Sequence, residues 1–219
     1  MIKLFLATID IFRDVNLYND IYYSLNKIRR DKVDKYSKLV DRQRSLLAGY
    51  LLKYSVGQCG IDYDTCEFII DESGYEHIVN EPECYFSLSH SGDVCVCAVS
   101  NRPIGVDVER KSRFLQSRND LLSKRIMNQE EFDLYNSLVN DDRILFSCKT
   151  WTRKEAYSKM CQKGLAMDLK TINTIDDGGF KTFEYNDDYL ISIVVHDRII
   201  NYDNLELLDV STDLEAINA

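Results

Sequence analysis

The sequence predicts an α+β protein with two similar lobes, residues 1–101 and 102–219. The chain has 219 residues, of which 45% are apolar and 29% are charged. This composition is typical of a packed globular protein, and the length fits one large unit or two lobes of roughly 100 residues each. The expected elements also run twice in the same order, with a strand, then helices, then further strands. That repeated order is what favours two similar lobes.

Hydrophobic periodicity and turn residues place the elements along the chain. Helices are expected at 18–30, 38–56, 118–126 and 128–139, followed by a long helix from Asp141 or Asp142 to about Cys161. Strands are expected at 2–9, 66–70, 75–79, 84–88, 93–100, 104–109, 180–185, 189–195 and 205–209. Between two of these strands, the residues Ser89-His90-Ser91-Gly92 are expected to form a turn.

The charge of the chain is unevenly distributed. The net charge is −9, which argues against a general nucleic-acid-binding protein. Residues 27–53 nevertheless hold nine Lys and Arg against three Asp, a local balance of +6. A basic segment on an acidic protein indicates a local anionic ligand, such as a phosphorylated small molecule. The alternative is that these cations form a solvated helix face.

Cysteine usage and the N-terminus bear on the cellular compartment. The chain has seven cysteines and no Cys-x-x-Cys pair, which favours reduced thiols and no zinc site. The apolar run at 1–9 lacks the length and cleavage site of a signal peptide, and no later run is long enough to span a bilayer. The sequence therefore predicts a cytoplasmic protein with no membrane partner.

Two carboxylates lie on a short strand that is rich in β-branched residues, 103–109. Side chains alternate along a strand, so Asp107 and Glu109 share one face while Val106 and Val108 share the other. Two carboxylates side by side need a compensating cation or water. Hard oxygen ligands of this kind suit Mg²⁺, which is often completed by substrate phosphates. The alternative is a solvated strand edge.

Two further stretches could carry chemistry. On a helix, Trp151, Glu155 and Lys159 share one side at i, i+4 and i+8, although Glu155 and Lys159 could also be an ordinary surface pair. The small residues around His90 leave room for a ligand near the backbone. A serine hydrolase is disfavoured because the chain has no Gly-x-Ser-x-Gly elbow.

Together these stretches resemble the 4′-phosphopantetheinyl transferases. The motifs are Ser-His-Ser-Gly at 89–92, Ile-Gly-Val-Asp-Val-Glu at 104–109 and Trp-Thr-x-Lys-Glu-Ala-x-x-Lys at 151–159. The chain length resembles the large monomeric type that activates surfactin synthetase. Arg-Ser-Leu-Leu at 44–47 and Lys-Gly-Leu at 163–165 are similar to two further family motifs. The chain departs from the family's usual Gly-Lys-Pro at Gly74-Tyr75-Glu76.

The resemblance implies a fold and a reaction. The implied fold has two α+β lobes related by a pseudo-two-fold axis, each an antiparallel sheet packed with helices, with coenzyme A in the cleft between them. The implied reaction moves the 4′-phosphopantetheine group from coenzyme A to a serine of an acyl- or peptidyl-carrier protein and releases adenosine 3′,5′-bisphosphate. Mg²⁺ is the implied cofactor, and a monomer is the implied state.

The resemblance also assigns roles to particular side chains. Asp107, Glu109 and Glu155 would hold Mg²⁺, while Lys154, Lys159 and His90 would contact the phosphates. Arg44, Ser45 and Ser89 would bind the nucleotide end of coenzyme A. Either Glu155 or Glu131 would be the base that deprotonates the carrier serine.

Two other classes of protein remain open at this stage. A metal-dependent nuclease could use Asp107 and Glu109 with a lysine such as Lys111, although the acidic net charge opposes it. A non-catalytic module that binds coenzyme A or a carrier protein is the other alternative. The presence of all three carboxylates and both lysines of the motifs opposes that second alternative.

Overall fold

A computed structural model of the chain describes residues 2–115, 119–163, 167–176, 179–196 and 202–216. Helices and mostly antiparallel strands alternate along it, which confirms the predicted α+β class. The chain divides into two compact units. Unit 1 comprises residues 1–102 and 203–219, and unit 2 comprises residues 103–202. None of the helices in the described ranges is long and apolar enough to cross a membrane.

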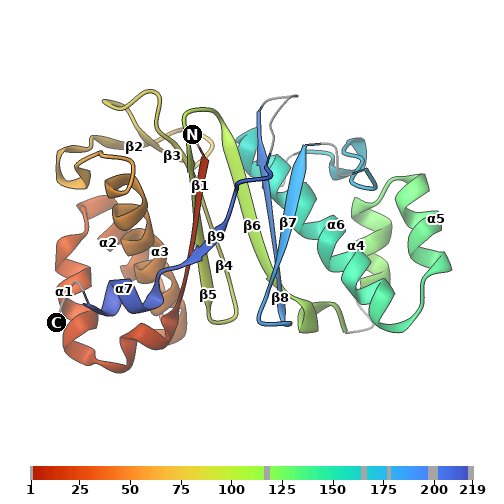
Figure 1. Cartoon of the computed structure of the whole chain (residues 1–219), viewed down its shortest axis with the longest axis horizontal. Helices are drawn as coiled ribbons and strands as arrows, with labels where there is room; N and C mark the ends of the chain where they lie inside the picture. The colour runs from red at the N-terminus through yellow and green to blue at the C-terminus, as the bar shows by residue number, and fades with distance from the viewer. Residues whose placement is uncertain (1, 116–118, 164–166, 177–178, 197–201, 217–219) are drawn as a thin grey trace. The chain divides into compact units, whose positions relative to one another are not determined.

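Unit 1 is a four-stranded sheet packed with helices (Figure 1). Its elements are β1 (Ile2–Thr8), η1 (Ile9–Arg13), α1 (Val15–Ser24), α2 (Lys27–Asp34), α3 (Leu39–Gly57), η2 (Tyr63–Thr65), β2 (Phe68–Ile70), β3 (Glu76–Ile78), β4 (Tyr85–Ser91), β5 (Val94–Ser100), β9 (Leu207–Asp209) and α7 (Ser211–Ala216). The strand order is β4-β5-β1-β9, and β2 and β3 form a separate hairpin. Leucines of α3, such as Leu47 and Leu51, are fully buried with Phe5 of β1 in the core of the unit.

The C-terminal segment lies with unit 1, whereas the sequence assigned it to the second lobe. Strand β9 pairs in parallel with β1, with Leu4 opposite Leu207. Val210 donates its backbone N–H to the carbonyl of Leu6, and Leu214 is fully buried. Figure 1 shows this blue segment beside the red strand β1. A strand of three residues carries no local signal for the sheet edge that it joins, so the sequence could not assign it.

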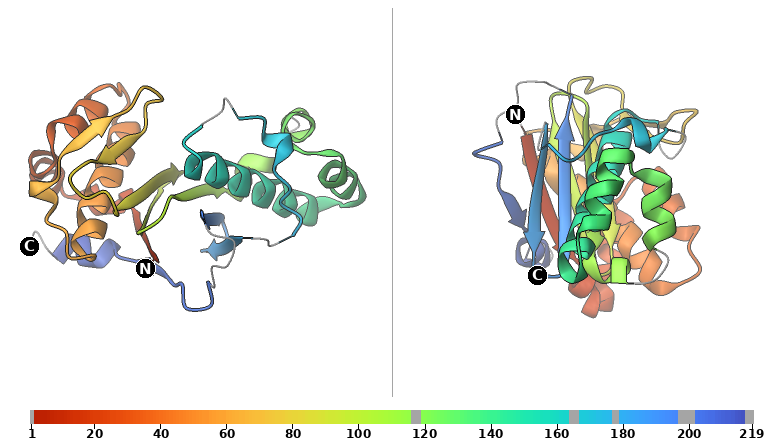
Figure 2. Two further views of the ribbon diagram at one scale, coloured as in Figure 1. Left: turned by 90° about the horizontal axis from the view of Figure 1, so that it is seen from above. Right: turned by 90° about the vertical axis from the view of Figure 1, so that its right-hand side faces the viewer.

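Unit 2 is a three-stranded antiparallel sheet covered by a long helix. Its elements are β6 (Ile104–Arg110), η3 (Lys111–Leu115), α4 (Asn119–Ile126), α5 (Gln129–Ser137), α6 (Asn140–Met160), η5 (Leu169–Thr171), β7 (Phe180–Tyr185) and β8 (Tyr189–Val195). The strand order is β6-β8-β7, and every pair is antiparallel. Helix α6 runs along β6 and β8, and α4 and α5 lie on its other side (Figure 2).

A glycine brings α6 very close to β6. A Cβ atom added at Gly105 would lie 1.8 Å from the backbone oxygen of Ala156. Only glycine fits at this position, because any side chain would push the helix away from the strand. The close approach brings Glu155 and Lys159 of α6 near the side chains of β6. Gly105 and Ala156 therefore set the distance between β6, which carries Asp107, and α6.

Two local predictions differ from the structure. The helix expected over 18–30 is two helices, because Leu25 is extended and Asn26 begins α2 by accepting the N–H of Arg29 at 3.0 Å. The turn expected at 89–92 is shorter, since β4 continues to Ser91 and only Gly92 takes a positive φ of 56°. His90 is consequently a strand residue and not a turn residue.

Candidate active site

One candidate site lies in unit 2, around Asp107 of β6. This carboxylate is 5% exposed, and its Oδ1 atom lies 2.7 Å from the ammonium nitrogen of Lys159. Lys159 also donates to the carbonyl of Val106 at 3.1 Å. Its side chain keeps 23% exposure, so the ammonium can reach both the buried carboxylate and an incoming ligand. A cation held in this way can stabilise negative charge on a phosphate.

Glu155 lies beside this pair with an unsatisfied oxygen. Its Oε1 atom is buried and has no hydrogen-bond partner in the described part of the chain. Burial raises the pKa of the Glu155 carboxyl, and the negative charge of Asp107 raises it further. An unpaired carboxylate oxygen in a half-buried position is costly, so it indicates a missing cation or proton. Glu155 is therefore the strongest sign that this site takes a ligand.

Glu109 is engaged differently from the other two predicted metal ligands. Its Oε1 atom accepts the indole N–H of Trp151 at 3.0 Å and forms an ion pair with Arg113. The guanidinium of Arg113 also lies over the Trp151 ring, 5.4 Å from its centroid. The predicted set of three carboxylates is thus not assembled around one point. Within the described ranges, no three His, Cys, Asp or Glu side chains are grouped so that they could hold a metal ion.

Two carboxylates nevertheless suffice for Mg²⁺, because this ion is usually held by one or two carboxylates and completed by water and substrate phosphates. Asp107 and Glu155 supply hard oxygen ligands, and the buried Oε1 atom of Glu155 lacks any other partner within the described chain. The residues present therefore fit a cation bound by Asp107 and Glu155.

Lys154 and Glu131 form a buried structural pair, which corrects two predictions. The ammonium of Lys154 lies 2.6 Å from Oε2 of Glu131, and both side chains have 0% exposure. Lys154 also donates to three backbone carbonyls, those of Ile126, Leu169 and Ile172. Oε1 of Glu131 accepts two hydrogen bonds from Thr174. Lys154 therefore cannot contact substrate phosphates, and Glu131 is too enclosed to act as a base.

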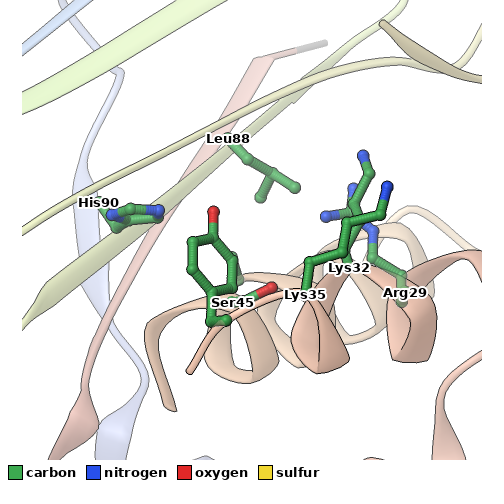
Figure 3. Close-up of a pocket in the computed structure, with 8 residues that line it drawn as sticks. Arg29, Lys32, Lys35, Ser45, Leu88 and His90 are labelled. Carbon is green, nitrogen blue, oxygen red and sulfur yellow. The ribbon is translucent and has the colours of Figure 1, made fainter. Parts of the chain in front are cut away.

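A separate candidate site is a pocket of about 480 Å³ in unit 1. Its lining includes Arg29, Lys32, Lys35, Ser45, Leu88 and His90. Figure 3 shows the side chains of Arg29, Lys32 and Lys35 on one side of the pocket, and Leu88 and His90 of strand β4 on the other. Leu88 and His90 share one face of β4, since they lie two residues apart. The basic segment predicted from the sequence thus supplies the walls of a real pocket.

Four residues of unit 1 are predicted to bind coenzyme A, and the pocket includes two of them in its lining and leaves two outside. Ser45 and His90 line it, as described above. Ser89 is 8% exposed and, as the residue next to His90 on a strand, faces the opposite side of the sheet. Arg44 donates to the carbonyl of Gly92 at 2.6 Å and pairs with Asp41 at 2.9 Å. Arg44 therefore fixes the β4–β5 turn that follows His90.

Sequence reasoning did not single out Arg29, Lys32 or Lys35 individually. The signal was present, because all three belong to the basic segment 27–53 and recur every third residue. Gly164 and Leu165 of the Lys-Gly-Leu motif lie outside the described residues. Lys111, which a nuclease would need, is paired with Glu184.

Comparison with known proteins finds one superfamily that matches part of the chain. The model of the 4′-phosphopantetheinyl transferase superfamily matches residues 103–202. A 4′-phosphopantetheinyl transferase of Bacillus subtilis is 27% identical over 161 residues, which cover 73% of this chain and 70% of that protein. Residues 103–202 of the chain thus match the 4′-phosphopantetheinyl transferase superfamily, and the chain as a whole is similar to a 4′-phosphopantetheinyl transferase over most of its length.

Other relatives within the superfamily match shorter stretches. The transferase Sfp of Bacillus subtilis strain 168 is 26% identical over 66% of this chain and 63% of its own length. The transferase HetI of Nostoc is 35% identical over 56% of this chain and 49% of its own length. The chain thus spans between about half and 70% of the length of these relatives. A holo-(acyl-carrier-protein) synthase from Bacillus anthracis, solved with coenzyme A, matches 42% of the chain and 93% of that protein at 21% identity and a TM-score of 0.38.

The superfamily match coincides with unit 2 and does not extend into unit 1. It contains Asp107, Glu109, Glu155 and Lys159, together with the helix and strand that hold them. The basic pocket lies entirely outside the matched residues. The carboxylates and Lys159 therefore lie in the part of the chain that matches the superfamily model, and the pocket lies in the other part.

Proposed function

We propose that the protein transfers the 4′-phosphopantetheine group from coenzyme A to a serine of an acyl- or peptidyl-carrier protein. The observation that carries this proposal is the group Asp107, Glu155 and Lys159, held on adjoining elements in the unit that matches the superfamily. The activity named for the relatives supports the same reaction. The proposed partners are coenzyme A and a carrier protein, and the proposed state is a cytoplasmic monomer.

The reaction is a transfer of a phosphoryl-type group. The hydroxyl oxygen of the carrier serine forms a bond to the phosphorus that carries the pantetheine arm. The bond between that phosphorus and the bridging pyrophosphate oxygen breaks, and adenosine 3′,5′-bisphosphate leaves with the electron pair. Positioning and stabilisation of negative charge dominate catalysis of such transfers. Lys159 supplies one positive charge for this purpose, and Asp107 fixes its ammonium at 2.7 Å.

Asp107 and Glu155 are the proposed ligands of Mg²⁺, which would neutralise charge on the pyrophosphate when bound. The proton of the serine hydroxyl needs an acceptor. Glu131 is enclosed at 0% exposure, so Glu155 remains the candidate base, acting directly or through water.

The pocket of unit 1 is the proposed site for the nucleotide end of coenzyme A. Lys32 and Lys35 present positive charge to a phosphate group, and His90 and Ser45 add hydrogen-bonding groups. Leu88 offers an apolar surface next to these polar groups. A nucleotide with a phosphate monoester has groups that complement both features. Its phosphate is anionic and suits the lysines, and its flat base suits the apolar surface of Leu88.

The replacement Asp107→Ala tests the proposal. Removing one well-placed electrostatic contact of an active site typically lowers the rate about 100- to 1000-fold. We expect that loss in carrier-protein modification, measured by mass as the gain of one phosphopantetheine, over a range of Mg²⁺ concentrations. Asp133→Ala removes an exposed carboxylate of the same unit and should leave the rate unchanged. Full activity of Asp107→Ala, or of the wild type in excess chelator, would overturn the mechanism.

A further inference from the structure

A buried carboxylate contacts two of the cations that line the pocket of unit 1. Glu76, the first residue of β3, has a side chain that is only 3% exposed. Its Oε1 atom accepts the Nε–H of Arg29 at 2.9 Å, and its Oε2 atom lies 2.9 Å from the terminal guanidinium nitrogen of the same arginine. The ammonium of Lys32 lies 2.7 Å from Oε2 as well. One carboxylate thus bridges two of the three cations that line the pocket.

This bridge uses both ends of the Arg29 guanidinium, whereas Lys32 and Lys35 keep N–H groups that could bind a ligand. The two-point contact uses the fork of donors with which an arginine would otherwise grip a phosphate. The stem of Arg29 is also confined, since a Cβ atom added at Gly49 would lie 3.3 Å from its Cδ atom. Lys32 donates one of its three N–H groups to Glu76, and the described residues give Lys35 no ion pair. A ligand phosphate would therefore meet Lys32 and Lys35 and not Arg29.

We propose that Glu76 is a specificity-determining residue of this pocket, which limits its positive charge and so weakens its hold on the phosphate monoester of a nucleotide. The inference rests on the proposed function, because it assumes that the pocket receives the nucleotide end of coenzyme A. The negative charge of Glu76 lies 2.7 to 2.9 Å from two of the pocket's cations and offsets the attraction that they exert on a phosphate. The released nucleotide, adenosine 3′,5′-bisphosphate, then dissociates more readily after transfer.

The chain offers an isosteric test. Glu76→Gln keeps the shape and an acceptor oxygen but removes the charge. At the effective dielectric constant of a protein surface, a unit charge at this range changes anion affinity on the order of 10-fold. By titration calorimetry we expect Glu76→Gln to bind adenosine 3′,5′-bisphosphate about 10-fold more tightly than the wild type. Binding of 3′-dephospho-coenzyme A, which lacks the 3′-phosphate and so has no phosphate monoester, should change less than threefold.

Two control variants separate local charge from other effects. Asp31→Asn makes the same change of net charge on α2, but Asp31 is exposed and pairs with Lys27, so affinity should change less than twofold. The double variant Arg29→Met with Glu76→Gln restores the wild-type charge of the pocket and should restore affinity to within about threefold. Thermal melting checks that each variant is folded, and Glu76→Ser is a second neutral variant if Gln is not tolerated.

The possible results distinguish this inference from the proposed function. If Lys35→Met weakens the binding of adenosine 3′,5′-bisphosphate but neither neutral Glu76 variant strengthens it, the role of Glu76 is wrong and the pocket assignment stands. If Lys35→Met also leaves binding unchanged, the nucleotide does not bind in this pocket and both ideas fall. Tighter binding by a neutral Glu76 variant, reversed in the double variant, supports the inference.

Discussion

Lys154 and Glu155 are neighbours on helix α6, yet their surroundings are opposite. The ammonium of Lys154 is fully buried and contacts four acceptors, the carboxylate of Glu131 and three backbone carbonyls. The carboxylate of Glu155 is half-buried beside Asp107, and its Oε1 atom has no partner within the described residues. A rotation of about 100° around the axis of α6 separates a charge that the fold satisfies completely from one that it leaves incomplete.

The difference teaches how to separate structural from functional charges. A buried charge that is fully hydrogen-bonded needs nothing more, and its position is fixed by the elements around it. Lys154 ties α6 to the end of α4 and to the segment around η5. A half-buried charge with an open oxygen is stable only when something else completes it. Glu155 is therefore the member of the motif that is arranged for a ligand.

The largest expected effect belongs to the buried pair. Lys154→Met should lower the free energy of unfolding by about 3–5 kcal/mol, because it leaves the carboxylate of Glu131 buried without its cation. The measurement is chemical denaturation of wild type and variant at neutral pH. The comparison predicts that this loss comes from the orphaned charge and not from lost packing, since methionine fills a similar volume.

A second variant makes that explanation falsifiable. Replacing both members, Lys154→Met with Glu131→Leu, removes the orphaned charge and should recover most of the lost stability. The Thr174 groups that bonded Glu131 would then lack a partner, so recovery would be incomplete. A double variant as unstable as Lys154→Met alone would show that the pair itself contributes the stability.

Glu155→Gln should have a smaller effect of the opposite sign. The amide removes a poorly solvated negative charge next to Asp107, so we expect the protein without metal to gain about 1 kcal/mol of stability. Transfer activity should fall at the same time. Thermal melting in chelator and in excess Mg²⁺ provides the measurement, because Mg²⁺ should raise the melting temperature of the wild type more than that of the variant.

Glu130→Gln is the matched control for this prediction. Glu130 is an exposed glutamate of the same unit, and its replacement should change stability by less than about 0.5 kcal/mol with no dependence on Mg²⁺. If Glu155→Gln lowers stability in chelator, Glu155 has a structural partner and the contrast with Lys154 fails.

Periodicity and spacing predicted the fold class and most elements, because amphipathic patterns report burial directly. The strands at 180–185 and 189–195 and the helix that begins near Lys38 are found where expected. The same signals could not place β9, whose three residues pair with a strand some 200 positions earlier. Local patterns describe faces and ends, whereas strand partners are decided by contacts distant in sequence.

The site shows the same limit. Spacing put Asp107 and Glu109 on one face of a strand, but spacing does not say which cation each will meet. Arg113 and Trp151 bind Glu109, while Lys159 binds Asp107. The motif also presented Lys154 and Glu155 as equivalent members of one group. Only the packing of α6 against its neighbours separates them, and that packing depends on residues far from the motif.

Replacing a buried thiol should have the smallest effect on stability at neutral pH, because a buried neutral group differs from a buried charge such as Lys154. Burial raises the pKa of Cys97 in unit 1 and of Cys148 in unit 2 to about 12 each. A protonated thiol is neutral, so at pH 7 it needs no partner of the kind that Lys154 has. Burial of the thiol lowers the stability of the protein only at alkaline pH, where the unfolded chain loses the thiol proton and the native state retains it.

The sign of this effect follows from proton binding. Below about pH 8.5, both states hold the thiol proton and the stability is unaffected. Between that value and about pH 12, the native state binds more protons than the unfolded state, so stability falls as pH rises. Each thiol contributes a loss of about 1.4 kcal/mol per pH unit. Denaturation of wild type, Cys97→Ala and Cys148→Ala from pH 7 to 10.5 measures the slopes. Each replacement should make the alkaline slope shallower by that amount, and an unchanged slope would mean that the thiol ionises as readily in the native state as in the unfolded chain.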